Sequence, residues 1–225
     1  MGIHDGHREK KRRQFLDHGL DSFADHEALE LLLFYAIPRR DTNVTAHRLL
    51  EKFGTLDGVL SAPVEELCQV EGVGETAAAL LKLVPQIYRR ARLSAARQET
   101  ILNSTRLAGD YLLCLFIGET HTEVLYQLCL DRKGKLLACR KVGTGGVSAV
   151  SVDIRKIVEN ALLTGASDVI LAHNHPSGVA LPSEDDYAAT YQVREALRTV
   201  GVRLTDHIVV SDNDYVSMKD SGHLG

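Results

Sequence analysis

The stretch from Ile170 to Asp186, Ile-Leu-Ala-His-Asn-His-Pro-Ser-Gly-Val-Ala-Leu-Pro-Ser-Glu-Asp-Asp, is the part of this 225-residue chain that most constrains its fold. The apolar run Val169–Leu171 predicts a buried strand, and the two-residue period of a strand places His173 and His175 on one face at its end. Two imidazoles there can share one metal ion. A catalytic zinc commonly has three protein ligands, so the pair needs one further donor, often a carboxylate.

Asp186 can supply that donor. Residues 176–182 predict a loop that doubles back, and Ser183 predicts the start of a helix that carries Asp186 one turn in. In the alternative interpretation, Ser183 is a plain N-cap and Asp186 only interacts favourably with the helix dipole. That alternative explains the serine and the aspartate but gives the paired histidines no role.

The pattern His173-x-His175-Pro176, six residues, Ser183-x-x-Asp186 resembles the zinc-binding motif of JAMM (MPN-plus) metallopeptidases in ligand type and spacing. The resemblance implies a Zn²⁺ cofactor held by the two histidines and the aspartate. It also implies a cytidine-deaminase-like mixed sheet for the domain that carries the motif.

The wider string from His173 to Gly178, His-Asn-His-Pro-Ser-Gly, resembles the version found in the RadC family. Asn174 stands where deubiquitinating JAMM members usually carry Ser or Thr. The resemblance to RadC-like proteins extends over nearly the whole chain and includes a helix-hairpin-helix segment before the metallopeptidase-like domain.

The same resemblance implies the remaining catalytic groups. JAMM enzymes use a glutamate at the start of an early strand as general base, and Glu123 matches that position; Glu119 and Glu159 are alternatives. Ser183 would help to hold the oxyanion.

Other histidines give weaker signals. His207, beside Asp206, is either a support for a metal ligand or simply a buried, hydrogen-bonded histidine, and we expect the latter. The others lack partners at ligand spacing and are expected at the surface: His4, His7, His18, His26, His47, His121 and His223.

Composition is that of a soluble globular protein, with 44% hydrophobic and 25% charged residues and a net charge of −4. No apolar run approaches the roughly 18 residues of a membrane span, and the basic N-terminus is not followed by a secretory apolar core, so a cytoplasmic location is expected. The four cysteines lie in apolar contexts without a CxxC pair and predict core thiols.

Residues 1–97 predict a small all-helical domain, because apolar positions recur at helical spacing between glycine and proline breaks. The segment from Leu67 to Ala77 resembles a helix-hairpin-helix, whose glycines expose amides that can hold a phosphate. DNA-binding versions usually place Lys or Arg soon after the second glycine, but here Glu75 follows Gly74. Basic and acidic residues are also nearly equal in number, so weak DNA contact and a helical packing or protein-binding module both remain open.

Residues 98–225 predict a domain in which strands and helices alternate around one mixed sheet, so the fold class is mixed α+β or α/β. Helices are expected after Ser104, Asp153 and Ser183. Strands are expected at 123–130 and 135–142, joined by a hairpin turn, and at 167–172, 208–210 and 215–218.

The motif and its resemblance predict a zinc-dependent hydrolase that uses an activated water to cleave a peptide or isopeptide bond in a protein or peptide substrate. The alternative is a DNA-repair-associated protein that binds or hydrolyses nucleic acid. A non-catalytic binding module is a third possibility, against which the intact ligand set argues. No sequence pattern indicates an oligomeric state.

Overall fold

The computed structural model describes residues 3–38, 40–95, 100–119, 121–145, 152–211 and 213–224. The chain forms two compact units, Met1–Tyr88 and Arg89–Gly225. The expected domain boundary at residues 97/98 falls within residues 96–99, which lie outside the described residues.

The first unit is helical, as its apolar periodicity predicts. Leucines from successive helices fill its core, among them Leu29, Leu49, Leu67 and Leu81. The helices are α1 (Ile3–His18), α2 (Asp25–Leu33), α3 (Asn43–Phe53), α4 (Leu56–Ser61), α5 (Val64–Cys68) and α6 (Glu75–Ala95), of which α6 continues into the second unit.

The turn between α5 and α6 depends on Gly72. Its φ of +96° lies in the region that L side chains rarely adopt, and an added Cβ would stand 2.6 Å from Thr45 Oγ1 in α3. A hydrogen bond from Val73 N to Val70 O closes the turn at 3.0 Å. The glycine-dependent turn expected from the hairpin resemblance is therefore present, and Glu75 is the first residue of the helix that follows it.

The described residues of the second unit form a five-stranded mixed sheet with the order β2-β1-β3-β4-β5. β1 is antiparallel to both β2 and β3, β3 is parallel to β4, and β4 is antiparallel to β5. The elements are α7 (Thr105–Leu115), β1 (Val124–Leu130), β2 (Leu136–Thr144), α8 (Ile154–Thr164), β3 (Asp168–Asn174), α9 (Glu184–Thr199), β4 (Arg203–Ser211) and β5 (Asp214–Ser217).

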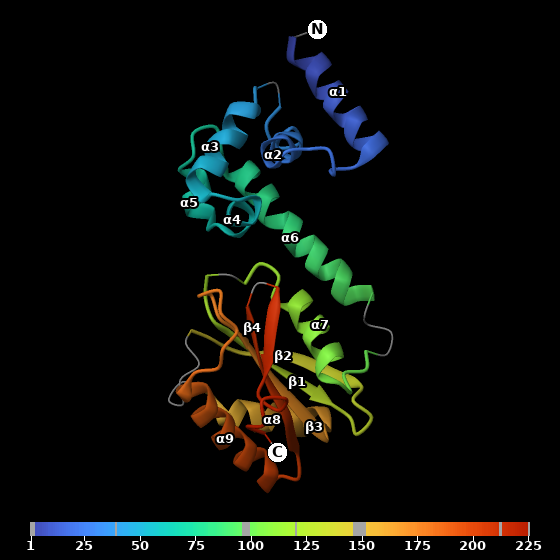
Figure 1. Cartoon of the computed structure of the whole chain (residues 1–225), viewed down its shortest axis with the longest axis vertical. Helices are drawn as coiled ribbons and strands as arrows, with labels where there is room; N and C mark the ends of the chain where they lie inside the picture. Colours follow the sequence, from blue (N-terminus) through green and yellow to red (C-terminus); the bar gives the residue numbers. More distant parts are fainter. Residues whose placement is uncertain are drawn as a thin grey trace. The chain divides into compact units, whose positions relative to one another are not determined.

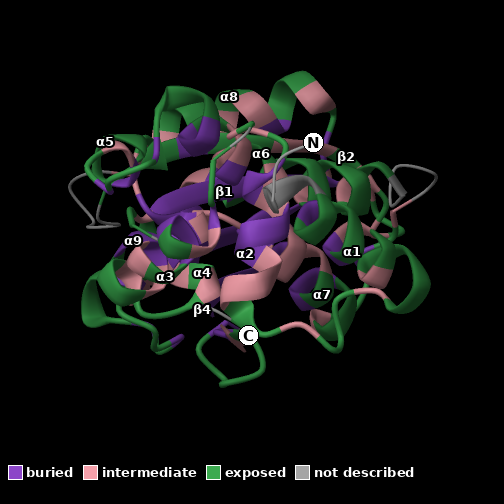
Figure 2. Cartoon of the chain, turned by 90° about the horizontal axis from the view of Figure 1, so that it is seen from above, coloured by how far each residue is buried: buried purple, intermediate pink, exposed green. Residues whose placement is uncertain are grey.

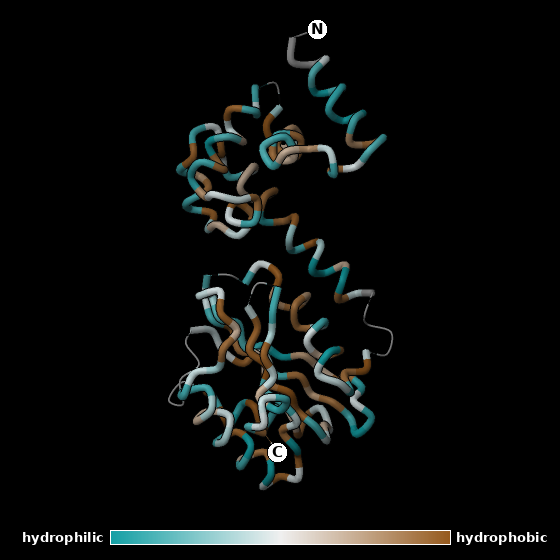
Figure 3. Tube along the Cα trace, viewed as in Figure 1, coloured by the Kyte–Doolittle hydropathy of each residue, from teal (hydrophilic) through white to brown (hydrophobic). Residues whose placement is uncertain are grey.

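Helices cover both faces of this sheet, α8 and α9 on one and α7 on the other (Figure 1). The alternation of β3 explains why: Val169 and Leu171 pack with α8 and α9, whereas Ile170 and Ala172 pack with α7. β1 is buried along its length (Figure 2), and hydrophobic segments, drawn in brown, run through this unit (Figure 3). The mixed-sheet prediction is confirmed, with β3 as the central strand.

Local capping signals identify the helix starts correctly. Ser104 Oγ accepts a hydrogen bond from Leu107 N at 3.3 Å, and Asp153 Oδ1 accepts one from Lys156 N at 2.9 Å. All four cysteines are free thiols, but the prediction of core positions holds fully only for Cys129, because Cys68, Cys114 and Cys139 are only partly buried. Among the described residues, no helix has both the length and the apolar character needed to cross a membrane.

Candidate metal centre

Three side chains converge where β3 ends and α9 begins. His173 is the penultimate residue of β3, His175 follows that strand, and Asp186 is the third residue of α9. The two Nε2 atoms are 2.9 Å apart, His173 Nε2 lies 3.2 Å from Asp186 Oδ1, and His175 Nε2 lies 3.6 Å from Asp186 Oδ2. His173 and Asp186 are buried, whereas His175 is partly exposed, so solvent reaches the His175 side chain of this cluster.

These separations fit a single metal ion. Zn–N and Zn–O bonds are about 2.0–2.2 Å, so donor atoms on a tetrahedral zinc lie about 3.3–3.5 Å apart. The distance between the two Nε2 atoms, and the distance from each of them to its nearer Asp186 oxygen, Oδ1 for His173 and Oδ2 for His175, lie within about half an ångström of that value.

The hydrogen-bond network assigns the tautomer of His173. Thr190 Oγ1 lies 2.5 Å from the carbonyl oxygen of Asp186, which can only accept, so the single hydroxyl hydrogen points there. His207 Nδ1, 2.5 Å from the same hydroxyl, must then donate to it. In neutral His207 the other nitrogen, Nε2, accepts, and it lies 2.8 Å from His173 Nδ1. His173 therefore carries its proton on Nδ1 and presents the lone pair of Nε2 to the cluster.

The neutral state of His207 follows from its surroundings. Burial lowers the pKa of His207 well below its usual value, and the neighbouring His173 lowers it further. A neutral imidazole has one donor and one acceptor nitrogen, as the assignment above requires.

The tautomer of His175 is also set by a hydrogen bond at Nδ1, but with a different partner. Its Nδ1 lies 3.1 Å from the carbonyl oxygen of Val179, in the loop between β3 and α9. A carbonyl oxygen only accepts, so Nδ1 donates and Nε2 keeps its lone pair. Both histidines thus direct an unprotonated nitrogen at the same point.

Two lone pairs and a carboxylate at such short range repel one another unless a cation lies between them. A proton can join only two of the three donors at a time, whereas a metal ion can contact all three. The described residues that converge at the end of β3 therefore form a group that can bind a metal ion.

Ser183 holds the carboxylate of this group in place. Asp186 Oδ2 accepts hydrogen bonds from Ser183 N at 2.8 Å and from Ser183 Oγ at 2.6 Å, while Asp186 N donates to Ser183 Oγ at 3.2 Å. Burial would raise the pKa of Asp186, but a proton that joins it to His173 Nε2 and the hydrogen bonds from Ser183 lower that pKa well below its usual range. Asp186 is thus ionised and can serve as an anionic ligand, while Ser183 caps α9 and holds this carboxylate in place.

Glu123 stands directly before β1. The hydrogen bond from Gly145 N to Glu123 O, 2.8 Å long, continues the pairing of β1 with β2 by one residue. Two residues further on, the Cα of Leu125 pairs with that of His173. Because side chains paired across strands share a face, alternation places Glu123 on the His173 side of the sheet.

The two alternative glutamates are placed differently. Glu119 Oε1 lies 3.5 Å from Arg89 Nη1 and 3.7 Å from Lys141 Nζ, so its carboxylate is engaged in ion pairs. Glu159 is exposed on α8, whose buried residues are Ile157 and Ala161.

His207 is buried and hydrogen-bonded, as expected. Its partner is His173, so the alternative interpretation, in which His207 supports a metal-binding group, also fits the structure. Its place depends on the parallel pairing of β3 and β4, in which Leu171 pairs with His207. Thr190, the next residue in the chain of bonds, had no sequence signal. Of the other histidines, His7, His18, His47, His121 and His223 are exposed and His26 is half-buried.

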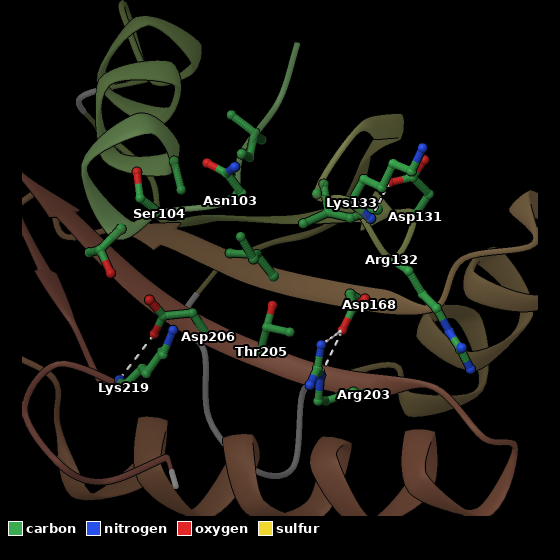
Figure 4. A pocket seen from close by; sticks show the side chains of 16 residues that line it. Asn103, Ser104, Asp131, Arg132, Lys133, Asp168, Arg203, Thr205, Asp206 and Lys219 are labelled. Carbon is green, nitrogen blue, oxygen red and sulfur yellow. Dashed lines mark hydrogen bonds and ion pairs between the residues drawn. The ribbon is translucent and has the colours of Figure 1, made fainter. Parts of the chain in front are cut away.

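A separate cavity of about 380 Å³ lies at the opposite end of β3 (Figure 4). Asp168, the first residue of β3, lines it together with Ser104 at the start of α7 and Arg203 at the start of β4. None of the histidines or carboxylates of the metal centre contributes to its wall. This cavity and the metal centre are therefore lined by different residues.

The comparisons with known proteins show the family to which this chain belongs. Residues 102–223 match the family model described as the RadC-like JAB domain, and residues 5–79 match the UPF0758 N-terminal model. A UPF0758 protein of Rhodobacter capsulatus is 39% identical over 213 residues, which cover 95% of this chain and 99% of that protein. A UPF0758 protein of Ruegeria pomeroyi is 36% identical over 218 residues, 97% of each chain.

Fold, site and matched model together define a protein with a RadC-like JAB domain. The chain belongs to the RadC-like UPF0758 family, as its His-Asn-His-Pro-Ser-Gly string predicted.

Removal of one histidine tests the metal centre. In His175→Ala the cluster loses one of its three donors, so we expect metal content to fall well below the roughly one ion per chain of the wild type, with an unchanged circular dichroism spectrum. His18→Ala, an exposed histidine in α1, is the control. Equal metal content in His175→Ala, His18→Ala and wild type, measured by elemental analysis, would rule out this assignment.

Removal of His207 tests the supporting chain. His207→Leu leaves all three metal-binding side chains in place but takes away the acceptor that holds the His173 tautomer. We expect metal affinity to fall about 10- to 100-fold. Ser217→Ala, which removes a buried hydroxyl bonded to Asp206, controls for general loosening of the same strands. A metal-competition titration that gives the same Kd for His207→Leu and wild type would contradict the role of this histidine.

Proposed function

We propose that this protein is a zinc-dependent hydrolase that cleaves an amide bond, either a peptide or an isopeptide bond, in a protein or peptide substrate. The observation that carries the proposal is the convergence of two imidazole lone pairs and one carboxylate, each oriented by its own hydrogen bonds. Two imidazoles and one carboxylate form a donor set common to catalytic zinc sites, which keep a fourth position open. The resemblance of the motif to JAMM metallopeptidases supports an amide as the bond that is cleaved.

A zinc ion held by His173, His175 and Asp186 would lower the pKa of a water ligand towards neutrality and polarise the substrate carbonyl. Glu123 takes a proton from the attacking water as its oxygen bonds to the carbonyl carbon. The same glutamate then delivers that proton to the leaving nitrogen when the C–N bond breaks.

Ser183 has two successive tasks in this proposal. Before substrate binds, its hydroxyl donates to Asp186 Oδ2 and orients the carboxylate. In the reaction the hydroxyl hydrogen turns to the developing oxyanion, while the backbone N–H of Ser183 continues to hold Asp186.

Two carboxylate variants separate the chemistry from metal binding. Glu123→Gln keeps the size of the side chain but cannot accept the proton, so turnover should fall by about 10²- to 10⁴-fold while metal content and fold are retained. Asp186→Asn removes an anionic ligand and should lose the metal first. Both are measured with an amide substrate identified from a peptide and isopeptide screen. Near-normal turnover by metal-replete Glu123→Gln would show that the base lies elsewhere.

For the helical unit we propose only weak contact with duplex DNA. Glu75 opens α6 beside Gly74 and places a negative charge at the amides that would otherwise hold a phosphate. Anisotropy with the full chain should show weak binding that falls steeply as salt rises, and Glu75→Lys should strengthen it at low salt. Tight, sequence-specific binding by the wild type at physiological salt would overturn this proposal.

A further inference from the structure

Asn174 lies between the two metal-site histidines, yet its side chain serves a different part of the fold. It ends β3, and alternation turns it away from His173 towards the face that α7 covers. The residue is 4% exposed. Its Oδ1 accepts a hydrogen bond from Val124 N at 2.7 Å, and its Nδ2 donates to the carbonyl oxygens of Glu119 at 2.6 Å and Thr122 at 3.0 Å.

Two of these three hydrogen bonds are made by the residues directly before and after Glu123 in the chain. Asn174 holds the Thr122 carbonyl on one side of Glu123 and the Val124 amide on the other. The carbonyl of Glu123 itself accepts from Gly145 N. The backbone on both sides of Glu123 is thus tied to the strand that carries His173.

The far end of the same segment is also fixed. Glu119, whose carbonyl oxygen bonds to Asn174, has its carboxylate 3.5 Å from Arg89 Nη1 and 3.7 Å from Lys141 Nζ. Arg89 Nη2 in turn donates to the Tyr126 hydroxyl at 2.9 Å. Residue 119 is therefore held through its side chain as well as its backbone.

We propose that Asn174 is a positioning residue that sets Glu123, the general base of the proposed function on which this inference rests, against the metal-binding histidines. Only a side-chain amide supplies one acceptor and two donors from a single short group. An aspartate at this position keeps the acceptor for Val124 N but has no N–H group, so its second oxygen would face the carbonyl oxygens of Glu119 and Thr122 without a hydrogen bond. A serine hydroxyl has one hydrogen for two acceptors.

The test uses Asn174→Ala and Asn174→Asp in the full-length chain. The control is Gln127→Ala, because Gln127 is a buried side-chain amide of β1 whose hydrogen bonds go to Ile157 O and Asn160 in α8. We expect kcat to fall about 100-fold in both Asn174 variants, with KM and metal affinity unchanged, because a small displacement of a catalytic group is costly. Gln127→Ala should retain kcat. Hydrogen exchange at the Val124 amide should accelerate in Asn174→Ala and stay slow in Gln127→Ala.

A double variant shows whether Asn174 acts through Glu123. Adding Asn174→Ala to Glu123→Gln should cost no further turnover, since the base is already lost. Additive losses, wild-type turnover in both Asn174 variants, an equal kcat loss in Gln127→Ala, or unchanged exchange at Val124 would each overturn the positioning role. Normal turnover by Glu123→Gln alone is a different result, because it overturns the proposed base and with it the reason for positioning it.

Discussion

The hydrogen bond between His173 Nδ1 and His207 Nε2 is the contact on which the metal centre depends most. It begins a chain that runs through the Thr190 hydroxyl to the backbone carbonyl of Asp186, whose carboxylate returns to His173 Nε2. This ring of contacts joins β3, β4 and α9. It therefore sets the tautomer of His173 and the position of Asp186 together. Buried polar groups that are fully paired in this way are rigid, and a rigid donor set favours one metal geometry.

The strand pairing of the sheet brings the residues of this network close together. The parallel pairing of β3 with β4 brings His207 beside the strand of His173, and the antiparallel pairing of β1 with β3 brings Leu125, two residues after Glu123, opposite the same histidine. Opposite faces of β3 have different partners: His173 faces His175 and Asp186, whereas Asn174 faces the segment that carries Glu123. One strand end therefore orients both the metal-binding groups and the proposed base.

Much of this arrangement could be predicted from local sequence. The apolar run before His173, the proline-bounded loop and the Ser183 cap each follow from short-range physical rules, and together they place Asp186 near the histidines. His207 could not be assigned in the same way. It stands 34 residues from His173, and its contact depends on a strand register that no local pattern states. The role of Asn174 was hidden for the same reason, since its partners lie 50 or more residues earlier in the chain.

X-ray absorption at the zinc edge, on protein purified without added metal, tests the central claim most directly. The account predicts a zinc ion whose protein ligands are only nitrogen and oxygen at about 2.0–2.2 Å, with an imidazole signal from two histidines. His207→Leu should keep the same ligand types with a more disordered imidazole signal, since only the orientation of His173 is loosened. A sulfur shell at about 2.3 Å, or protein that contains no bound metal, would contradict the assignment of the end of β3 as the metal centre.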